Sequence, residues 1–165
     1  AGSIGPGWGN GKATAATFAR AGAKVFCVDL NMDAAAETAA IITGEGFEAT
    51  AHAADVSDEA AVADMVAACV AKYGRVDILH NNVGIASLGG PIDTTLAQWE
   101  RVMRVNVTSM FLTCQAVIPL FLEQGGGAIV NVSSLSATKA ARPELAYATS
   151  KGAELLCGGH RLMDE

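Results

Sequence analysis

The chain has 165 residues, of which 51% are hydrophobic, 17% charged and 5% aromatic, and its 17 acidic and 11 basic side chains give a net charge of −6. This composition is too apolar and too weakly charged for a disordered segment, and the length suits one globular domain. The acidic balance argues against a nucleic-acid partner. The four cysteines include no C-x-x-C pair and no secretory leader is recognisable, so we expect reduced thiols in a cytoplasmic protein.

Short apolar strands alternate with Ala-rich helices along the chain. The expected elements are a helix over 11–21, a strand over 24–29, a helix over 33–43, a strand over 47–54, a helix from an N-cap at Ser57 to Tyr73, a strand over 76–79, one bent or two consecutive helices over 95–124, a strand over 128–132 and a helix from Tyr147 onward. Gly74 is expected to end the helix that finishes at Tyr73. This alternation indicates βαβ units and an α/β fold with a parallel sheet covered on both faces.

Residues 105–122 carry no formal charge and just reach the length of a membrane span. They include Asn106, Gln115 and Pro119, and burying such polar groups in lipid would leave them unsatisfied. We therefore expect a helix buried between protein layers and no membrane association.

A glycine-rich segment over residues 5–12 is the first chemical signal. Glycine allows a tight turn from strand to helix and lets a pyrophosphate contact bare main chain at a helix N-terminus. The residues expected to contact such a cofactor are Gly5, Gly9, Asn10 and Gly11. The phosphate loop of ATPases, G-x-x-x-x-G-K-[ST], does not match, because Pro6 replaces its first Gly and Ala13 replaces its Ser/Thr.

Asp29 lies at the end of the next expected strand, twenty residues beyond Gly9. A carboxylate at this place accepts hydrogen bonds from the adenosine ribose hydroxyls and repels a 2′-phosphate. Neither Trp8 nor Leu30, which follows Asp29 at the adenosine end of the expected site, supplies a cation for that phosphate. The sequence therefore predicts a preference for NAD over NADP.

Tyr147 and Lys151 are four residues apart in an expected helix, so they share one face. A free tyrosine ionises near pH ~10, and an adjacent cation lowers such a pKa by ~1–3 units. Ser134 lies at the C-terminal end of the strand over 128–132, where open parallel sheets place their ligands. Its hydroxyl is therefore a candidate for a catalytic group, and Ser136, two residues later, is a less favoured candidate for the same role.

With these motifs in this order, nearly the whole chain resembles the classical short-chain dehydrogenase/reductase family. The other matching segments are Asp55-Val56, Asn81-Asn82-Val83-Gly84, Asn106 and Ser133-Ser134. Val83 stands where the family usually has Ala, which is a small steric change. The resemblance implies a Rossmann-type doubly wound parallel sheet with strand order 3-2-1-4-5-6-7.

The resemblance also implies a role for each matching residue. Tyr147 would be the general acid/base, and Lys151 would lower its pKa and hold the nicotinamide ribose. Ser134 would hydrogen-bond the substrate oxygen, and Asn106 would hold a water in the proton relay. The remaining cofactor-binding residues would be Asp55 and Val56 at the adenine, with Asn82 and Gly84 supporting the cofactor. No metal is implied, and His52, His80 and His160 lack metal-ligand spacing.

The predicted function is that of an oxidoreductase moving a hydride between NAD(H) and a small alcohol or ketone. The alternatives are a non-catalytic dinucleotide-binding module, an inactive fragment of such an enzyme, or a dehydratase or epimerase on the same fold. The resemblance also implies a homodimer or homotetramer, with the helices of 95–124 pairing across the interface.

The family pattern extends beyond both ends of this sequence. We expect one partial NAD-binding domain over residues 1–165, lacking most of the first strand and the C-terminal strands. Either Ile4-Gly5 replaces the family's Thr-Gly, or Thr-Gly lies upstream and the loop carries an insertion. Because the first strand is central in the sheet, we expect the isolated chain to be unstable and inactive.

Overall fold

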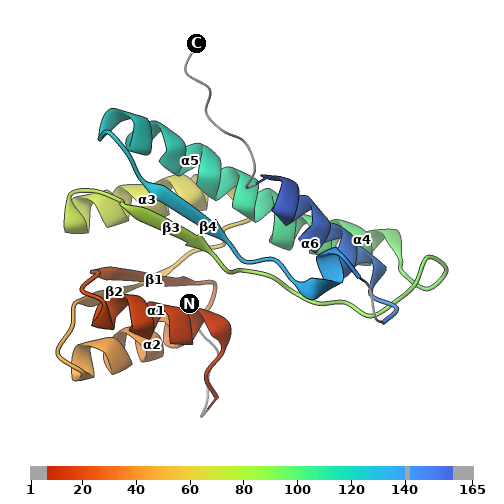
Figure 1. Ribbon diagram of the computed structural model, residues 1–165, viewed down its shortest axis with the longest axis horizontal. Helices are drawn as coiled ribbons and strands as arrows, with labels where there is room; N and C mark the ends of the chain where they lie inside the picture. Colours follow the sequence, from red (N-terminus) through yellow and green to blue (C-terminus); the bar gives the residue numbers. More distant parts are fainter. Residues whose placement is uncertain (1–6, 140–141, 158–165) are drawn as a thin grey trace. The chain divides into compact units, whose positions relative to one another are not determined.

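The computed structural model describes residues 7–139 and 142–157, with side chains as far as residue 155. Gly5 of the predicted loop and His160 lie outside the described residues. The chain divides into two compact units, an N-terminal unit over 1–76 and a C-terminal unit over 77–165 (Figure 1). The described strands pair as β1–β2 and β3–β4, and both pairs are parallel. The predicted α/β class with parallel strands is confirmed.

From residue 7 onward, the part of the N-terminal unit that the structure describes contains two parallel strands and three helices. Its elements are α1 (Asn10–Arg20), β1 (Val25–Asp29), α2 (Met32–Gly44), β2 (Ala49–Ala53) and α3 (Glu59–Tyr73). β1 and β2 run in register from the pair Val25 and Ala49 to the pair Asp29 and Ala53. Both strands therefore end at the same edge of the unit, where parallel sheets present their loops to ligands.

The core of the N-terminal unit is built from small side chains. Ala15, Ala16 and Ala19 form one face of α1, and they pack with Cys27 of β1 and Ile42 of α2. Small residues at this spacing let the helices lie close to the strands. Desolvation raises the pKa of the Cys27 thiol to about 11, which keeps it protonated and inert.

Local capping explains where α2 and α3 begin. The Asn31 side chain accepts the Asp33 N–H at 2.9 Å, and α3 begins at the N-cap Asp58, whose Oδ1 accepts the Ala61 N–H at 2.9 Å. The predicted N-cap at Ser57 is wrong, because the Ser57 hydroxyl donates instead to Asp55 Oδ1 at 2.7 Å. Gly74, with φ 84°, ends α3 as predicted, since this left-handed conformation suits glycine.

The C-terminal unit contains the second strand pair and the remaining described helices. Its elements are β3 (Ile78–Asn81), α4 (Leu96–Met103), the π-helical turn η1 (Arg104–Thr108), α5 (Ser109–Glu123), β4 (Ala128–Asn131), the 3-10 turn η2 (Leu135–Ala137) and α6 (Leu145–Cys157). β3 and β4 run in register from Ile78 and Ala128 to Asn81 and Asn131. α5 contacts β3, whereas α6 contacts α4, η1 and η2.

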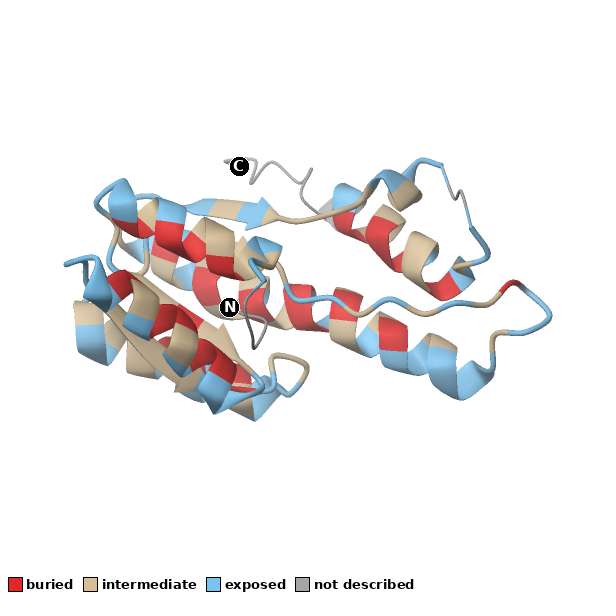
Figure 2. Cartoon of the chain, turned by 90° about the horizontal axis from the view of Figure 1, so that it is seen from below, coloured by how far each residue is buried: buried red, intermediate tan, exposed pale blue. Residues whose placement is uncertain are grey.

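The predicted helical segment over 95–124 is one helix from α4 through η1 to α5. Thr95 begins it with a capping box, in which its Oγ1 accepts the Gln98 N–H and Gln98 Oε1 accepts the Thr95 N–H. One buried stripe follows its length, as Figure 2 shows in red. The stripe consists of Val102, Asn106, Ser109, Met110, Thr113, Val117 and Phe121. Spacings of three and four residues are typical of a helix with one buried face.

By length and composition, this helix could also cross a membrane. Among the described residues it is the one helix that passes this test, with a mean hydropathy of 1.6 over its most apolar window. The core helices of soluble proteins pass the same test, and 33% of that window is buried within the structure. The buried stripe therefore fits the predicted core helix.

Candidate active site

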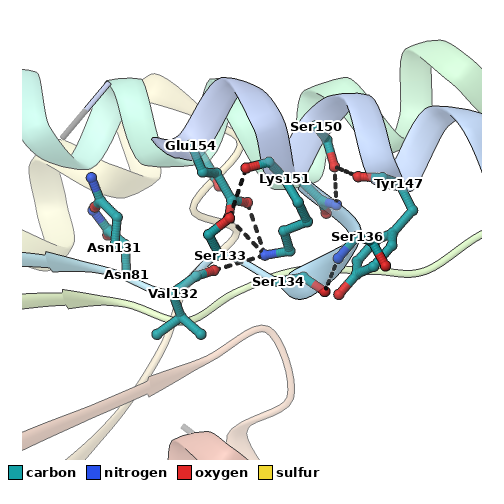
Figure 3. Close-up of polar contacts among 12 residues, drawn as sticks. Asn81, Asn131, Val132, Ser133, Ser134, Ser136, Tyr147, Ser150, Lys151 and Glu154 are labelled. Atoms are coloured by element: carbon teal, nitrogen blue, oxygen red, sulfur yellow. Dashed lines mark hydrogen bonds and ion pairs between the residues drawn. The ribbon is translucent and has the colours of Figure 1, made fainter. Parts of the chain in front are cut away.

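Lys151 lies on α6 and is 4% exposed. Its Nζ donates to the Val132 carbonyl at 2.9 Å, and to Glu154 Oε1 and Oε2 at 2.9 and 2.8 Å (Figure 3). The Ser133 hydroxyl donates to the Lys151 main-chain carbonyl at 2.7 Å. The segment after β4 thus holds both the side chain and the main chain of Lys151.

Tyr147 lies one turn before Lys151 on the same helix, as the spacing predicts. The Lys151 Nζ is 5.8 Å from the centroid of the Tyr147 ring, which is within the range of a cation–π contact. In Figure 3 the ring reaches from α6 toward the turn that carries Ser134 and Ser136. The structure therefore places the phenol beside a cation and directs it toward the predicted serine.

Ser134 and Ser136 use their hydroxyls differently. Ser134 is the N-cap of η2, and its Oγ accepts the Ser136 N–H at 3.2 Å. As the acceptor in that bond, Ser134 keeps its own proton for another acceptor. The Ser136 hydroxyl donates instead to Glu144 Oε1 at 2.8 Å. Of the two serines, Ser134 is thus the better donor to a substrate oxygen.

Asn106 lies in the π-helical turn η1 and is 1% exposed. Its Oδ1 accepts the Ile85 N–H at 2.8 Å, and its Nδ2 donates to the Ile85 carbonyl at 3.0 Å and to Ser150 Oγ at 2.8 Å. One amide therefore joins the loop after β3, the long helix and α6. Both N–H donors are used, so a relay water at this side chain would bind the second lone pair of Oδ1.

Gly84 provides the space for this arrangement. A Cβ added at Gly84 would lie 3.1 Å from Lys151 Nζ and 3.6 Å from Asn106 Oδ1. A larger residue at this position would therefore force the Lys151 ammonium to shift by a few tenths of an ångström, and no positive φ adds to that effect. Asn82 follows β3 and is half-buried, whereas the neighbouring Asn81 connects the sheet by donating from Nδ2 to Asn131 Oδ1 at 2.9 Å.

The predicted pyrophosphate loop leads into α1. Gly9 is the N-cap of α1, and Asn10 and Gly11 open the helix. Because Gly9 has no side chain, it caps none of the N–H groups in the first turn of α1. Lys12 is 2% exposed and pairs with Glu37 Oε1 at 2.6 Å, so its charge is engaged by α2.

The predicted adenosine residues lie at the carboxyl ends of β1 and β2. Asp29 ends β1, and its Oδ1 accepts the Asn31 N–H at 3.0 Å, while the adjacent Leu30 is 73% exposed. Asp55 follows β2, its Oδ1 accepts the Ser57 N–H at 2.9 Å, and Val56 is half-buried. The N-terminal unit thus carries the residues predicted at the pyrophosphate and adenosine, and the C-terminal unit carries the residues predicted to be catalytic.

Two residues of the catalytic region were missed by the sequence analysis. Ser150, which is fully buried, bonds Asn106 and donates to the Tyr147 carbonyl at 2.7 Å. Glu154 is 4% exposed, and burial raises its pKa despite the opposing hydrogen bond from Lys151. The available signal was helical spacing, since Glu154 lies three residues after Lys151. In the described part of the chain, no cluster of His, Cys, Asp and Glu could hold a metal ion.

Comparison with known proteins identifies the family. Residues 3–156 match the family described as short chain dehydrogenase. The D-threitol dehydrogenase of Mycolicibacterium smegmatis is 41% identical over 87% of this chain and 55% of its own length. A Burkholderia xenovorans structure described as a short-chain dehydrogenase/reductase has a TM-score of 0.92 and 43% identity, over 95% of this chain and 62% of its own length. The chain therefore belongs to the short-chain dehydrogenase/reductase family, and the predicted Rossmann-type fold is confirmed.

A further solved relative contains a cofactor. A 7α-hydroxysteroid dehydrogenase complexed with NADH and 7-oxo glycochenodeoxycholic acid has a TM-score of 0.82 and 34% identity, over 87% of this chain and 56% of its own length. Across these three relatives, the chain spans 55% to 62% of the other protein's length.

Proposed function

We propose that this chain forms the cofactor-binding and catalytic part of an oxidoreductase that transfers a hydride between NAD(H) and a small alcohol or ketone. The observation that best supports this proposal is the Lys151 ammonium, 5.8 Å from the Tyr147 ring, on a helix that faces the Ser134 turn. Family membership supports the same class of reaction.

The side chains of the C-terminal unit suit the proton transfer that such a reaction needs. Alcohol oxidation requires a base that takes the hydroxyl proton as hydride leaves the carbon. Tyr147, as a phenolate, accepts that proton, and the adjacent Lys151 cation stabilises the phenolate. Ser134 donates a hydrogen bond to the substrate oxygen. In the reverse direction, Tyr147 returns the proton to the carbonyl oxygen.

Asn106 acts mainly by fixing the parts of the site. Its three hydrogen bonds hold the loop at Ile85 and the helix at Ser150, one residue before Lys151. Proton transfer depends steeply on geometry, so this rigidity supports catalysis. We keep the predicted relay water at Asn106 as part of the proposal.

The N-terminal unit suits a dinucleotide, and NAD(H) when bound supplies or accepts the hydride. Gly9, Asn10 and Gly11 would hold the pyrophosphate at the α1 N-terminus, as Gly5 would in the preceding segment. Asp29 and Leu30 would lie at the adenosine ribose, and Asp55 and Val56 at the adenine. Asn82, Gly84, Tyr147 and Lys151 would complete the cofactor site at the nicotinamide end.

The preference for NAD over NADP rests on charge. A 2′-phosphate beside Asp29 would be repelled, and the exposed Leu30 brings no compensating cation. The Lys12 ammonium, which follows the predicted pyrophosphate loop, is buried and paired with Glu37. Comparable kcat/KM values with NAD and NADP would contradict this part of the proposal.

We propose a small-molecule substrate and a cytoplasmic homodimer or homotetramer, without nucleic-acid or membrane partners. Two large apolar side chains of α5 are exposed: Phe111 is 56% exposed and Leu122 is 64% exposed. Such exposed apolar side chains favour a helix–helix interface. A monomer by light scattering would contradict the assembly.

The experiment that tests the function uses the protein as it is naturally encoded and follows NADH formation with a panel of polyols and secondary alcohols. D-Threitol belongs in the panel because a relative at 41% identity is named for it. Tyr147→Phe should keep NAD binding, measured by calorimetry, and lose about 10²–10⁴-fold in turnover. Near-normal turnover in Tyr147→Phe would move the acid/base role to another residue.

The alternatives predict different outcomes of the same experiment. A non-catalytic module binds NAD and turns over no substrate, but it has no need of a phenol held beside a buried ammonium. A dehydratase or epimerase converts substrate without net NADH formation. Quantifying NADH against product therefore separates the three.

A further inference from the structure

Glu154 is a buried carboxylate that the proposed function leaves without a role. It lies one turn beyond Lys151 on α6, and both members of the pair are nearly excluded from solvent, at 5% and 4% exposure. Among the residues that the structure describes, Glu154 is the one buried acidic side chain. Burying a carboxylate is costly, and pairing with a buried ammonium offsets this cost only in part. A role for Glu154 beside Lys151 would explain why a charged residue is buried here.

The pair uses every donor of the Lys151 ammonium. An ammonium has three N–H donors, and the three acceptors within 2.9 Å are the Val132 carbonyl and the two oxygens of Glu154 (Figure 3). A hydrogen bond from Lys151 to a cofactor ribose therefore requires one donor to leave Glu154. Because Glu154 is held through two oxygens, one bond can be released while the ion pair persists.

Glu154 also offsets the charge that Tyr147 experiences. The carboxylate lies 2.8 Å from Lys151 Nζ, whereas the Tyr147 ring centroid lies 5.8 Å from the same atom. A negative charge this close to the ammonium weakens the attraction that the ammonium exerts on a phenolate. Burial raises the Glu154 pKa, which agrees with a carboxylate held in a poorly solvated place.

Other charges near α6 are more exposed to solvent. The helix packs against α4, η1 and η2. Glu100 and Arg101 on α4 and Arg104 on η1 are exposed, and η2 has no ionisable side chain. Glu144, which precedes α6, is bonded by Ser136. Solvent screens exposed charges strongly, so Glu154 is the main counter-charge to Lys151.

We propose that Glu154 is a positioning residue that holds the Lys151 ammonium at the end of β4 and limits how strongly this ammonium acts on Tyr147 and on the cofactor ribose. The inference rests on the proposed function, because the roles of Tyr147 and Lys151 are those given above. In this role Glu154 acts through Lys151, to which both of its carboxylate oxygens are bonded.

The test is Glu154→Gln in the naturally encoded protein, with two measurements. The acid limb of the kcat profile for alcohol oxidation should move to lower pH by about 0.5–1 unit, because the uncompensated ammonium favours the phenolate. The Kd for NAD should fall about threefold to tenfold, because a buried ammonium without its carboxylate gains more from a ribose hydroxyl. Lost packing alone would move neither the pH limb nor the Kd in these directions.

Two further variants make the test decisive. Glu123→Gln removes the same charge from an exposed position at the end of α5 and should leave both measurements at their original values. Glu154→Asp keeps the carboxylate but shortens its reach, so its acid limb should lie between those of the original protein and Glu154→Gln. If Glu154→Gln fails to fold, the Asp variant carries the test. The inference would be overturned if the acid limb and the NAD Kd of the Glu154 variant equalled those of Glu123→Gln. A higher Kd, meaning weaker NAD binding, would also overturn it.

Lys151→Met separates this inference from the proposed function. Loss of turnover in Lys151→Met, together with unchanged behaviour in the Glu154 variants, would reject the role of Glu154 alone. Normal turnover in Lys151→Met would contradict the proposed function itself, whatever the Glu154 variants do.

Discussion

The hydrogen-bond partners of the predicted site residues lie at different sequence separations in the two units. In the N-terminal unit, Asp29 and Asp55 accept hydrogen bonds from main-chain groups only two residues away. In the C-terminal unit, Asn106 bonds partners 21 and 44 residues away, and the Lys151 side chain reaches a carbonyl 19 residues away. Short-range hydrogen bonds are found at the proposed adenosine end, whereas hydrogen bonds between distant elements join the residues of the proposed catalytic end.

This difference predicts that substituting a residue with long-range bonds, such as Asn106, lowers the stability of the C-terminal unit. Substituting a residue at a strand end, such as Asp29, should change cofactor binding alone. The largest effect is expected from Asn106→Ala. It removes three hydrogen bonds and leaves the partly buried N–H and carbonyl of Ile85 without this partner, so the free energy of unfolding should fall by about 2–4 kcal/mol. Urea unfolding measures this change, and a loss below that of an ordinary surface substitution would refute the long-range account.

A smaller and more specific effect is expected from Asp29→Ala. The NAD Kd should rise about tenfold, because charge-assisted hydrogen bonds to the ribose are lost, while kcat stays near its original value. The preference for NAD over NADP should narrow. A fall in kcat with an unchanged KM for NAD would show that Asp29 serves the chemistry rather than the cofactor.

The Asn31→Ala substitution should lower the free energy of unfolding only slightly. Asn31 caps α2 through a single bond to the Asp33 N–H, and losing such a cap costs about 1 kcal/mol. The change should lower the melting temperature slightly and leave NAD binding intact. If its cost equals that of Asn106→Ala, the contrast between local and long-range contacts is wrong.

The smallest effect is expected at Cys27. Its pKa is raised to about 11 by burial, so at pH 8 almost none of the thiol is ionised. Unfolding restores an ordinary thiol near pKa 9.0, so the Cys27 contribution to stability is complete below pH 9 and declines as pH rises toward 11. Mass spectrometry after brief alkylation at pH 8 should find Cys27 unlabelled, and rapid labelling would contradict its burial.

Elements that follow local chemistry were predictable from the sequence. The start of the long helix at Thr95, the end of α3 at Gly74 and the shared face of Tyr147 and Lys151 depend on neighbours within a few residues. The N-cap of α3 could not be predicted, because serine and aspartate are both good caps. The folded chain makes Asp58 the cap, while the Ser57 hydroxyl donates to Asp55. The sequence also left open whether residues 95–124 form one helix or two.

Contacts between distant elements could not be predicted from the sequence. Ser150 and Glu154 were not singled out, because a serine or glutamate in a helix is ordinarily exposed and only the packing of α6 buries them. The space filled by Gly84 beside Lys151 is likewise a property of the folded unit. The expected instability and inactivity of the isolated chain remain predictions, as do the individual roles of the site residues.

The most direct test of the central claim is a deuterium transfer measurement with the naturally encoded protein. A secondary alcohol carrying deuterium on its carbinol carbon is incubated with NAD, and the reduced cofactor is analysed by mass spectrometry. Direct hydride transfer predicts one deuterium on the nicotinamide ring for each ketone formed, at a rate that Tyr147→Phe lowers by about 10²–10⁴-fold. Product formed without deuterium in the cofactor, or equal transfer in Tyr147→Phe, would contradict the account.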